Sequence, residues 1–332
     1  MNNLKRILPL LGAILCLLIY FHFRVENFLT WYNMVDLAQQ ITVNAILAFG
    51  MTLTILIGGI DLSMGALLAL VGVVTAFVLV EGPGAGQGGM GMAGGGAPMG
   101  GDLGLLRLCL AVGAGLCVAA VFGAFNGICA ATTRMPPFII TLATMLIARG
   151  TAYGFNKAMP LHIPEREGLF LSLGNGRLFA FLPVPVLVML AVFAAMAVLL
   201  HRTRFGQHLY AIGGNREAAR FTGIPLVRRT VSVYVIASLL VAVAGMIHAS
   251  QLYSAEPASG QGFELNAVAA AVVGGTSFTG GIGTMWGTLA GAVIIGILDK
   301  GLNQANVHFS LQYIVKGLVI LGAVWIDVRR GR

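Results

Sequence analysis

One polar interval of the chain, residues 201–229, carries the side chains best suited to contact another molecule in water. Its arginines outnumber its single acid, Glu217. A loop this basic beside apolar segments is retained on the cytoplasmic side of a membrane. Asn215 is a good helix N-cap, Glu217 in the first turn suits the positive end of the helix dipole, and Gly223 is a stop signal. The pattern predicts a short helix from Asn215 to Gly223, after a flexible Gly213–Gly214 pair.

The faces of this short helix favour contact with a partner rather than burial in its own domain. Ala218 and Ala219 are small enough for close approach, and Arg216 and Arg220 lie four residues apart on one side. We expect the helix to dock on another protein. The alternative is a solvated loop that lies on lipid headgroups, with its arginines paired to anionic phosphate.

A second group of polar residues interrupts an apolar run at residues 58–65, where glycines precede Asp61 and Ser63. Irregular backbone at membrane depth survives only where protein or a water-filled cavity satisfies it, and an intramembrane acid is a functional candidate. Asp61 and Ser63 are therefore candidates for lining a polar path. The favoured alternative is structural: Asp61 caps the following helix through backbone N–H groups and holds a tight turn.

A similar interruption occurs late in the chain, at residues 273–284, and contains Thr276 and Ser277. Broken helices at corresponding positions of two halves indicate an internal repeat with the path between them. Thr276 and Ser277 are therefore further candidates for the path. Close helix packing through small residues explains the glycines of this interval equally well.

A third group of candidates for the path centres on Asn126, which lies between aromatic residues in an apolar run. Its carboxamide could exchange hydrogen bonds with a polyol while Phe122 or Phe125 stacks on the apolar face of that ligand. An Asn that joins two helices through hydrogen bonds is at least as good an explanation.

The elements that must position these residues are membrane helices. Of the 332 residues, 58% are hydrophobic and only 10% are charged, whereas soluble domains carry about 25% charged residues. We predict an all-α polytopic membrane protein with about ten spans, arranged as two related halves with broken helices, in one transmembrane unit of residues 1–332. The expected spans are Ile7–Phe23, Val35–Ile57, Leu62–Val80, Leu105–Ala131, Pro137–Gly154, Phe181–Leu200, Thr230–Gln251, Leu265–Gly275, Thr284–Leu298 and Leu311–Asp327.

Charge predicts the topology of these spans. An even number puts both termini on one side, and Lys5, Arg6 and the arginines at 329, 330 and 332 place that side in the cytoplasm. The first apolar run lacks a cleavage pattern and is expected to be retained. Residues 82–101 form a low-complexity Gly/Met-rich run that we expect to be a flexible periplasmic loop.

The sequence also argues against other classes of protein. The formal charge of +8 lies mostly in short loops and termini, so nucleic-acid binding is not expected. The four cysteines have no metal-ligand spacing, and no metal or other cofactor is expected in the chain. No G-x-x-x-x-G-K-[ST] motif occurs, so this chain has no P-loop, and if ATP drives its function another chain must bind the nucleotide. An ion-driven secondary transporter would need more ionisable residues within its spans.

Several motifs in order resemble one family. Glu217-Ala218-Ala219, three residues and then Gly223 is similar to the EAA-x3-G signature of permease subunits of bacterial ABC importers. Further motifs look like those of the ribose, xylose and galactose type: Gly50-Met51-Thr52, Gly58-Gly59-Ile60-Asp61-Leu62-Ser63, Phe125-Asn126-Gly127, Pro136-Pro137-Phe138-Ile139, Ala211-Ile212-Gly213-Gly214-Asn215 and Gly274-Gly275-Thr276-Ser277. Permeases for branched-chain amino acids or nucleosides share much of this resemblance.

The resemblance implies a membrane subunit of the bacterial inner membrane that imports a monosaccharide by alternating access. It implies a homodimer or a heterodimer with a similar permease, ATPase subunits that bind ATP and Mg, and a periplasmic sugar-binding protein. The long Gly/Met-rich loop departs from the short loop expected there. The residues implied in coupling to the ATPase are Gly206, Asn215, Arg216, Glu217, Ala218, Ala219, Arg220 and Gly223.

Overall fold

A computed structural model describes residues 2–82, 101–178 and 181–330, and within them the chain is almost entirely helical. The Gly/Met-rich run therefore lies largely outside the described residues. The long helices are α1 (Asn2–Arg24), α2 (Trp31–Leu56), α3 (Met64–Glu81), α4 (Gly101–Thr132), α5 (Pro137–Gly154), α7 (Val184–Arg202), α10 (Leu226–Gln251), α12 (Met285–Gln304) and α13 (Phe309–Arg330). The shorter ones are α6 (Gly168–Asn175), α8 (Arg204–Gly214), α9 (Arg216–Phe221) and α11 (Phe263–Val273).

The α2 helix forms the centre of the bundle. In its most apolar window 83% of the residues are buried, because α2 packs against α7, α10, α11 and α12. By contrast, only 22% of the corresponding window of α4 is buried. Leucines such as Leu105, Leu106 and Leu110 are exposed on α4. Such a continuous apolar exterior is suited to lipid, and the all-α membrane fold predicted from the sequence is confirmed.

Each of the ten expected spans corresponds to a helix, but seven are long and apolar enough among the described residues to cross a membrane. The expected span Leu265–Gly275 is as short as the observed helix, which begins and ends two residues earlier. The observed helix is the 11-residue α11, which is about 16 Å long at 1.5 Å per residue, half of the roughly 30 Å of hydrocarbon. Its partner across the break, α12, has 20 residues instead of the expected 15-residue segment Thr284–Leu298.

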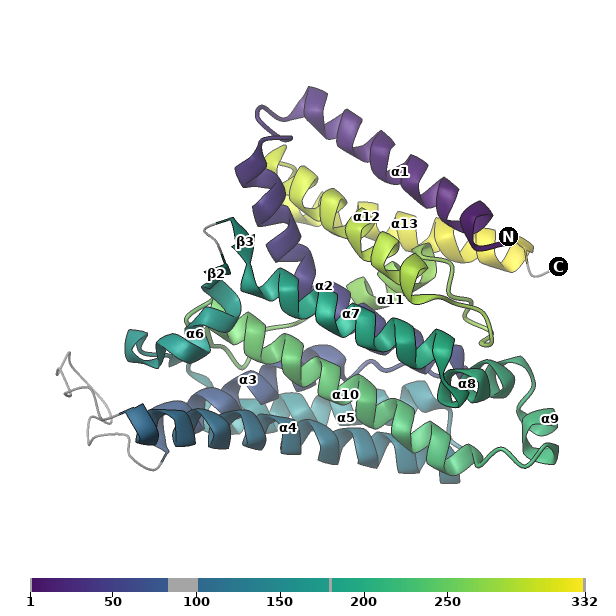
Figure 1. The fold of residues 1–332 in the computed structure, drawn as a ribbon, viewed down its shortest axis with the longest axis horizontal. Helices are drawn as coiled ribbons and strands as arrows, with labels where there is room; N and C mark the ends of the chain where they lie inside the picture. Colours follow the sequence, from purple (N-terminus) through teal and green to yellow (C-terminus); the bar gives the residue numbers. More distant parts are fainter. Residues whose placement is uncertain (1, 83–100, 179–180, 331–332) are drawn as a thin grey trace.

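The two ends of the bundle differ in character (Figure 1). At one end, on the right of the view, lie α8 and α9, and the first turn of α1 and the last turn of α13 lie on the same side above them. At the other end lie α6 and two small antiparallel ladders. One ladder pairs β1 (Leu161–His162) with β4 (Ser254–Ala255), and the other pairs β2 (Arg177–Leu178) with β3 (Leu182–Pro183).

Candidate functional site

The short helix predicted in the basic interval is present as α9. Asn215 is its N-cap, and the Oδ1 of Asn215 accepts a hydrogen bond of 2.9 Å from the N–H of Ala218. Glu217 occupies the first turn, where its charge faces the positive end of the helix dipole. After the last turn Gly223 takes a left-handed φ of +79°, which few other residues adopt without strain. The start and end signals are confirmed.

The surface of α9 is largely exposed to solvent. Its candidate coupling residues Arg216, Glu217, Ala218 and Arg220 are exposed, whereas Ala219 is buried. Phe221, which the motif-based reasoning did not single out, is 89% exposed at the end of the same helix. A whole aromatic ring in water beside two arginines is typical of a protein-binding surface. An unpaired apolar residue on a polar helix was the signal that could have identified it.

One arginine of the basic interval serves the fold instead of the surface. The Nε of Arg229 lies 3.0 Å from the Nδ1 of His208, and its guanidinium lies 5.4 Å from the ring centroid of Phe205. These contacts tie the first turn of α10 to α8. Arg228, its neighbour in the sequence, is exposed.

The expected flexible pair Gly213–Gly214 is wrong, because both glycines lie within α8. The helix begins at its N-cap Thr203, whose side chain accepts a hydrogen bond from the N–H of Gly206. Gly206 has no room for a side chain, since a Cβ there would lie 1.9 Å from the carbonyl oxygen of Leu200. The segment between α7 and α9 is thus a packed helix rather than a hinge.

The α8 helix contacts the end of α2, just before the first interruption, and the second interruption itself. Tyr210 donates a hydrogen bond of 2.7 Å from its hydroxyl to the carbonyl of Gly283, in the break between α11 and α12. A Cβ on Gly213 would lie 1.8 Å from the carbonyl oxygen of Leu56, the last residue of α2. That same carbonyl accepts a 2.9 Å hydrogen bond from the N–H of Gly281. The end of α2, the second break and α8 therefore meet at one junction, which we call the glycine junction (Leu56, Tyr210, Gly213, Gly281 and Gly283).

The electrostatics of the junction favour a permanent hydrogen bond. Burial raises the pKa of Tyr210 to about 12, because the phenolate would be desolvated there. The hydroxyl of Tyr210 consequently stays protonated and continues to donate to Gly283 at neutral pH.

The first interruption is a buried polar cluster that unites three of the sequence motifs. The Oδ1 of Asp61 accepts hydrogen bonds from the N–H and the hydroxyl of Ser63, at 2.9 Å and 2.5 Å. Asn126 of α4 donates to the hydroxyl of Ser63 at 3.1 Å and accepts from Thr144 of α5 at 2.6 Å. Thr141 of α5 bonds the same turn through the N–H of Leu62 and the carbonyl of Ile60.

This geometry favours the structural interpretation of Asp61 and Asn126. Ser63 is the N-cap of α3, and Asp61 holds the turn by accepting a hydrogen bond from the N–H of Ser63. Asp61 therefore bonds the N-cap residue, whereas the sequence predicted a bond to an N–H in the first turn of α3. Asn126 joins α4 to α5 and to the turn. The two aromatic candidates are more exposed than the buried side chain of Asn126: Phe125 is 51% exposed and Phe122 is half-buried.

Two polar oxygens near this cluster lack partners among the described residues. They are the Oδ2 of Asp61 and the hydroxyl of Tyr234, both buried. Tyr234 reaches the same turn, because a Cβ on Gly59 would lie 2.5 Å from its hydroxyl. A buried polar atom without a partner costs roughly 1–3 kcal/mol, so each of these two oxygens lowers the stability of the turn.

The second interruption holds Thr276 and Ser277, both buried. The N–H of Ser277 donates a hydrogen bond of 2.9 Å to the carbonyl of Ile282 and so closes the loop between them. The hydroxyl of Ser277 lies 3.0 Å from the hydroxyl of Thr279. The Oγ1 of Thr276 has no partner among the described residues. The glycine junction thus joins the second interruption to the end of α2, just before the first interruption. Asp61 and Thr276 have no bond to each other among the contacts described.

Charged residues inside the spans are paired. Lys316 lies 3.0 Å from the Oδ1 of Asp299, and Arg149 donates to the carbonyls of Pro257 and Ser259 at 2.7 and 2.6 Å. Within residues 2–82, 101–178 and 181–330 no group of three His, Cys, Asp or Glu side chains could hold a metal ion.

Comparison with known proteins gives consistent relatives. The family described as "Branched-chain amino acid transport system / permease component" matches residues 33–324. The ribose import permease protein of Escherichia coli K12 is 41% identical over 307 residues, which cover 92% of this chain and 88% of that protein. The ribose import permease protein of Bacillus subtilis is 39% identical over 98% of this chain and 94% of its own length.

A third relative carries a different printed substrate. The L-arabinose transport system permease protein of Escherichia coli K12 is 35% identical, over 91% of this chain and 84% of that protein. No solved structure matches the chain significantly. The family model covers residues 33–324, and the ribose import permease protein of Escherichia coli K12 is 41% identical over 92% of the chain. This chain therefore belongs to the family of transport-system permease components.

Proposed function

We propose that the chain is the membrane-spanning permease subunit of an ATP-driven importer for a monosaccharide. The supporting observation is the similarity to permeases whose printed substrates are ribose and L-arabinose, over nine-tenths of the chain. ATP and Mg would bind to a separate ATPase subunit. The permease itself would form the path and carry out no chemical step.

The coupling surface of this importer is α9. Its exposed residues combine a large apolar ring, Phe221, with the charges of Arg216, Glu217 and Arg220. Aromatic and arginine side chains dominate the energetics of protein interfaces, so Phe221 is proposed as the central contact with the ATPase.

The glycine junction would carry motion from α9 into the membrane. A shift of α9 moves α8, and α8 holds the end of α2 through Gly213 and the second break through Tyr210. At Gly213 the backbone of α8 packs directly on the backbone of Leu56 and Gly281, so no side chain between them can reorient and absorb a movement. Movement of α8 would therefore be passed to the end of α2 and to the second break together, and it would tilt the helices around the path. The residues proposed to line this path remain Asp61, Ser63, Phe122, Phe125, Asn126, Thr276 and Ser277.

The assembly and its orientation are also proposals. The basic end of the bundle, with α8, α9 and the helix ends of α1 and α13, would face the cytoplasm of a bacterial inner membrane. The opposite end would receive sugar from a periplasmic binding protein. A second permease, identical or similar, would complete the path.

A second candidate substrate class is branched-chain amino acids, which the description of the matching family names. The two classes are separated by uptake into vesicles that contain the permease with its ATPase and binding protein. ATP-dependent uptake of labelled ribose or L-arabinose, with none of leucine, supports the sugar proposal. Uptake of leucine alone contradicts it.

The coupling surface is tested in the same vesicles with Phe221→Ser. We expect the ATPase to dissociate during purification and sugar uptake to fall at least tenfold, because an interface anchor is worth about 2 kcal/mol or more. The matched control is Phe309→Ser, which removes another exposed aromatic ring, 66% exposed, at the start of α13 at the other end of the bundle. Equal ATPase retention by both variants would refute α9 as the coupling surface.

A further inference from the structure

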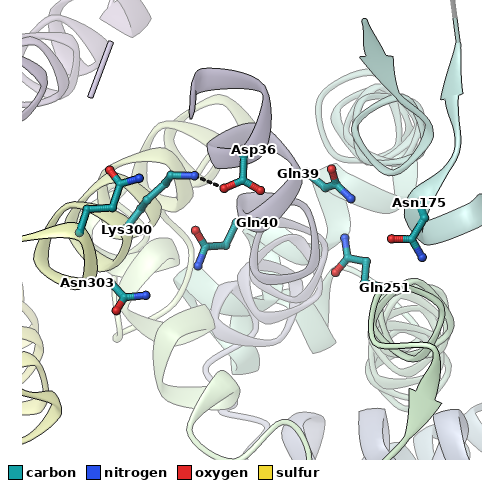
Figure 2. Close-up of a pocket in the computed structure, with 8 residues that line it drawn as sticks. Asp36, Gln39, Gln40, Asn175, Gln251, Lys300 and Asn303 are labelled. Carbon is teal, nitrogen blue, oxygen red and sulfur yellow. Dashed lines mark hydrogen bonds and ion pairs between the residues drawn. The ribbon is translucent and has the colours of Figure 1, made fainter. Parts of the chain in front are cut away.

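A polar pocket opens at the end of the bundle opposite α9. It has a volume of about 380 Å³. The direction of α10 fixes its location, since this helix starts at Leu226 just after α9 and ends at Gln251 in the wall of the pocket. The lining side chains come from the ends of α2, α6, α10 and α12 (Figure 2): Asp36, Gln39, Gln40, Asn175, Gln251, Lys300, Asn303 and Gln304.

One wall of the pocket is built from carboxamides that are held in place. Gln39 donates to the carbonyl of Gly174 at 2.8 Å, and Asn175 donates to the carbonyl of Ser250 at 2.7 Å. Ser250 is buried and accepts from the N–H of Gly174. These bonds fix the orientation of both carboxamides. The Nε2 of Gln251, between them, is buried without a partner among the described residues.

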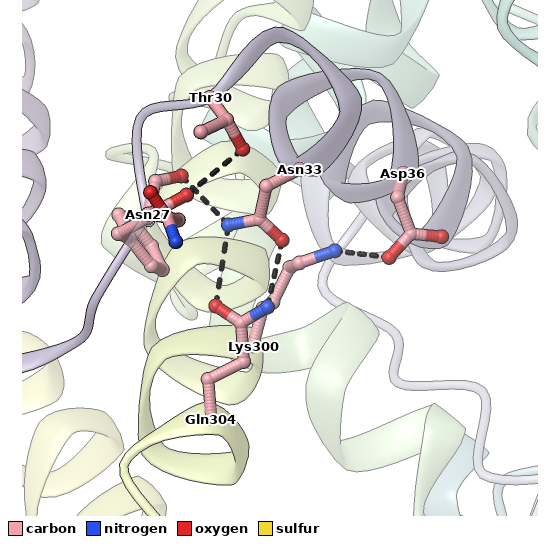
Figure 3. A network of polar contacts seen from close by, with 7 residues as sticks. Asn27, Thr30, Asn33, Asp36, Lys300 and Gln304 are labelled. Atoms are coloured by element: carbon pink, nitrogen blue, oxygen red, sulfur yellow. Dashed lines mark hydrogen bonds and ion pairs between the residues drawn. The ribbon is translucent and has the colours of Figure 1, made fainter.

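The opposite wall is fixed by a network between α2 and α12 (Figure 3). Lys300, only 5% exposed, forms an ion pair with Asp36. One turn further, Asn33 and Gln304 exchange two hydrogen bonds, of 2.7 and 3.2 Å. Asn33 also donates to the carbonyl of Phe28 at 2.6 Å. This network positions the charged pair at the rim of the pocket before any ligand arrives.

The donor set of the pocket matches the hydroxyl groups of a neutral polyol. A carboxamide offers both donors and acceptors, as each hydroxyl group does, and all lining residues among those described are polar or charged. An amino acid would need a counter-charge for its ammonium and another for its carboxylate. Asp36 and Lys300 already neutralise each other. A branched apolar side chain would find no apolar residue among those that line the pocket.

We propose that this pocket is an acceptance site for a monosaccharide on the outer side of the permease. Gln251 and Asn303, which make no hydrogen bond through their side chains within the described residues, would bond the sugar hydroxyls. This inference rests on the proposed sugar import and adds the residues that would recognise the sugar. The pocket receives the sugar from the binding protein, and it releases the sugar readily because its wall offers hydrogen bonds without stacking.

The test uses the complete importer in lipid vesicles, with the double variant Gln251→Leu/Asn303→Leu. We expect the apparent KM for ATP-dependent ribose or L-arabinose uptake to rise roughly tenfold, the factor that corresponds to about 1.4 kcal/mol of lost binding. Gln312→Leu, a carboxamide near the start of α13 that does not line the pocket, should leave the KM unchanged. Magnetisation transfer from the wild-type permease to free ribose should be seen by NMR and be lost in the double variant.

The outcomes separate the pocket from the proposed function. If wild-type vesicles import sugar and the double variant imports it with the same KM, the pocket is not a sugar site, although sugar import stands. If the double variant loses stimulation of ATP hydrolysis by both sugar-free and sugar-loaded binding protein, the pocket seats the binding protein and the inference is overturned. If wild-type vesicles import no sugar, the proposed function itself fails.

Discussion

At the residue scale, the buried turn at Asp61 shows how one carboxylate can organise a membrane fold. Asp61 is 1% exposed, and its Oδ1 holds Ser63, which in turn is linked through Asn126 to Thr144. Three segments that are separate in the sequence thus share one chain of hydrogen bonds. Such a network is worth more when every member is present, because removing one partner leaves others buried and unpaired.

Replacement of Asp61 by Ala should therefore destabilise the protein. We expect a loss of about 1–3 kcal/mol, because the N–H of Ser63 loses its acceptor inside the protein. Asp61→Asn keeps an oxygen at the same position and should lose less. Thermal unfolding of both variants in detergent measures the difference, and equal midpoints for Asp61→Ala and wild type would contradict the role of the turn.

Tyr210 provides a test of the glycine junction by pH. Its folded pKa of about 12 exceeds the ordinary value of 10.0, so its contribution to stability is complete below pH 10 and is lost as the pH rises toward 12. Tyr210→Phe removes both the hydrogen bond to Gly283 and this titration. The stability gap between wild type and Tyr210→Phe should be constant from pH 6 to about 9 and shrink by about pH 11. A gap that changes near neutral pH would refute the assignment.

At the element scale, α8 joins the exposed helix α9 to the membrane helices. Local preference alone would not make a helix of Ala211-Ile212-Gly213-Gly214, because each glycine costs about 1 kcal/mol relative to alanine in a helix. The helix persists because Gly213 packs directly on the backbone of Leu56 and Gly281. The glycine that weakens the helix locally is the residue that lets it dock.

The adjacent glycines of α8 form a matched pair of variants. Gly213→Ala would place a Cβ 1.8 Å from the carbonyl oxygen of Leu56 and 2.3 Å from the amide nitrogen of Gly281. Gly214→Ala meets nothing within 4 Å. We expect Gly214→Ala to be neutral or stabilising by up to roughly 1 kcal/mol. Gly213→Ala should lower sugar uptake several-fold for each ATP hydrolysed.

The ratio of uptake to ATP hydrolysis is the informative measurement for this pair. If Gly213→Ala lowers uptake and hydrolysis equally, the variant has lost folding or ATPase binding rather than transmission. If both alanine variants keep the wild-type ratio, the glycine junction does not transmit motion.

At the scale of the whole molecule, the bundle has one basic end and one carboxamide-rich end. Exposed arginines gather at α8 and α9, whereas the pocket with its amide side chains lies where α2 starts and α10 and α12 end. A transporter must present different surfaces to the partners on its two sides, and this asymmetry supplies them.

This orientation can be tested with single cysteines. In a chain whose native cysteines are replaced by Ala, Ala218→Cys should react with a membrane-impermeant maleimide only in inside-out vesicles. Asn303→Cys should react only in right-side-out vesicles. Both positions are exposed at opposite ends of the bundle. Labelling of both cysteines from the same side would contradict the proposed topology.

The amino-acid sequence by itself determined the helices, the two interruptions and the capped helix α9. These features depend on local rules: apolar runs of span length, glycines that break them, and the Asn215 and Gly223 signals at the ends of α9. The small length of the expected span Leu265–Gly275 was also visible in the sequence. The packing of this helix, α11, against α2 and α12 was not visible, because it depends on segments far away in the sequence.

Only the tertiary structure decided which distant residues meet. Asp36 and Lys300 are 264 positions apart and form one pocket rim, Tyr210 reaches Gly283, and Phe221 stays in solvent while the neighbouring Ala219 is buried. Local patterns carry no information about such contacts, because the packing of helices selects which ends lie side by side. The sequence therefore identified the family motifs, whereas the fold revealed the junction and the pocket that those motifs surround.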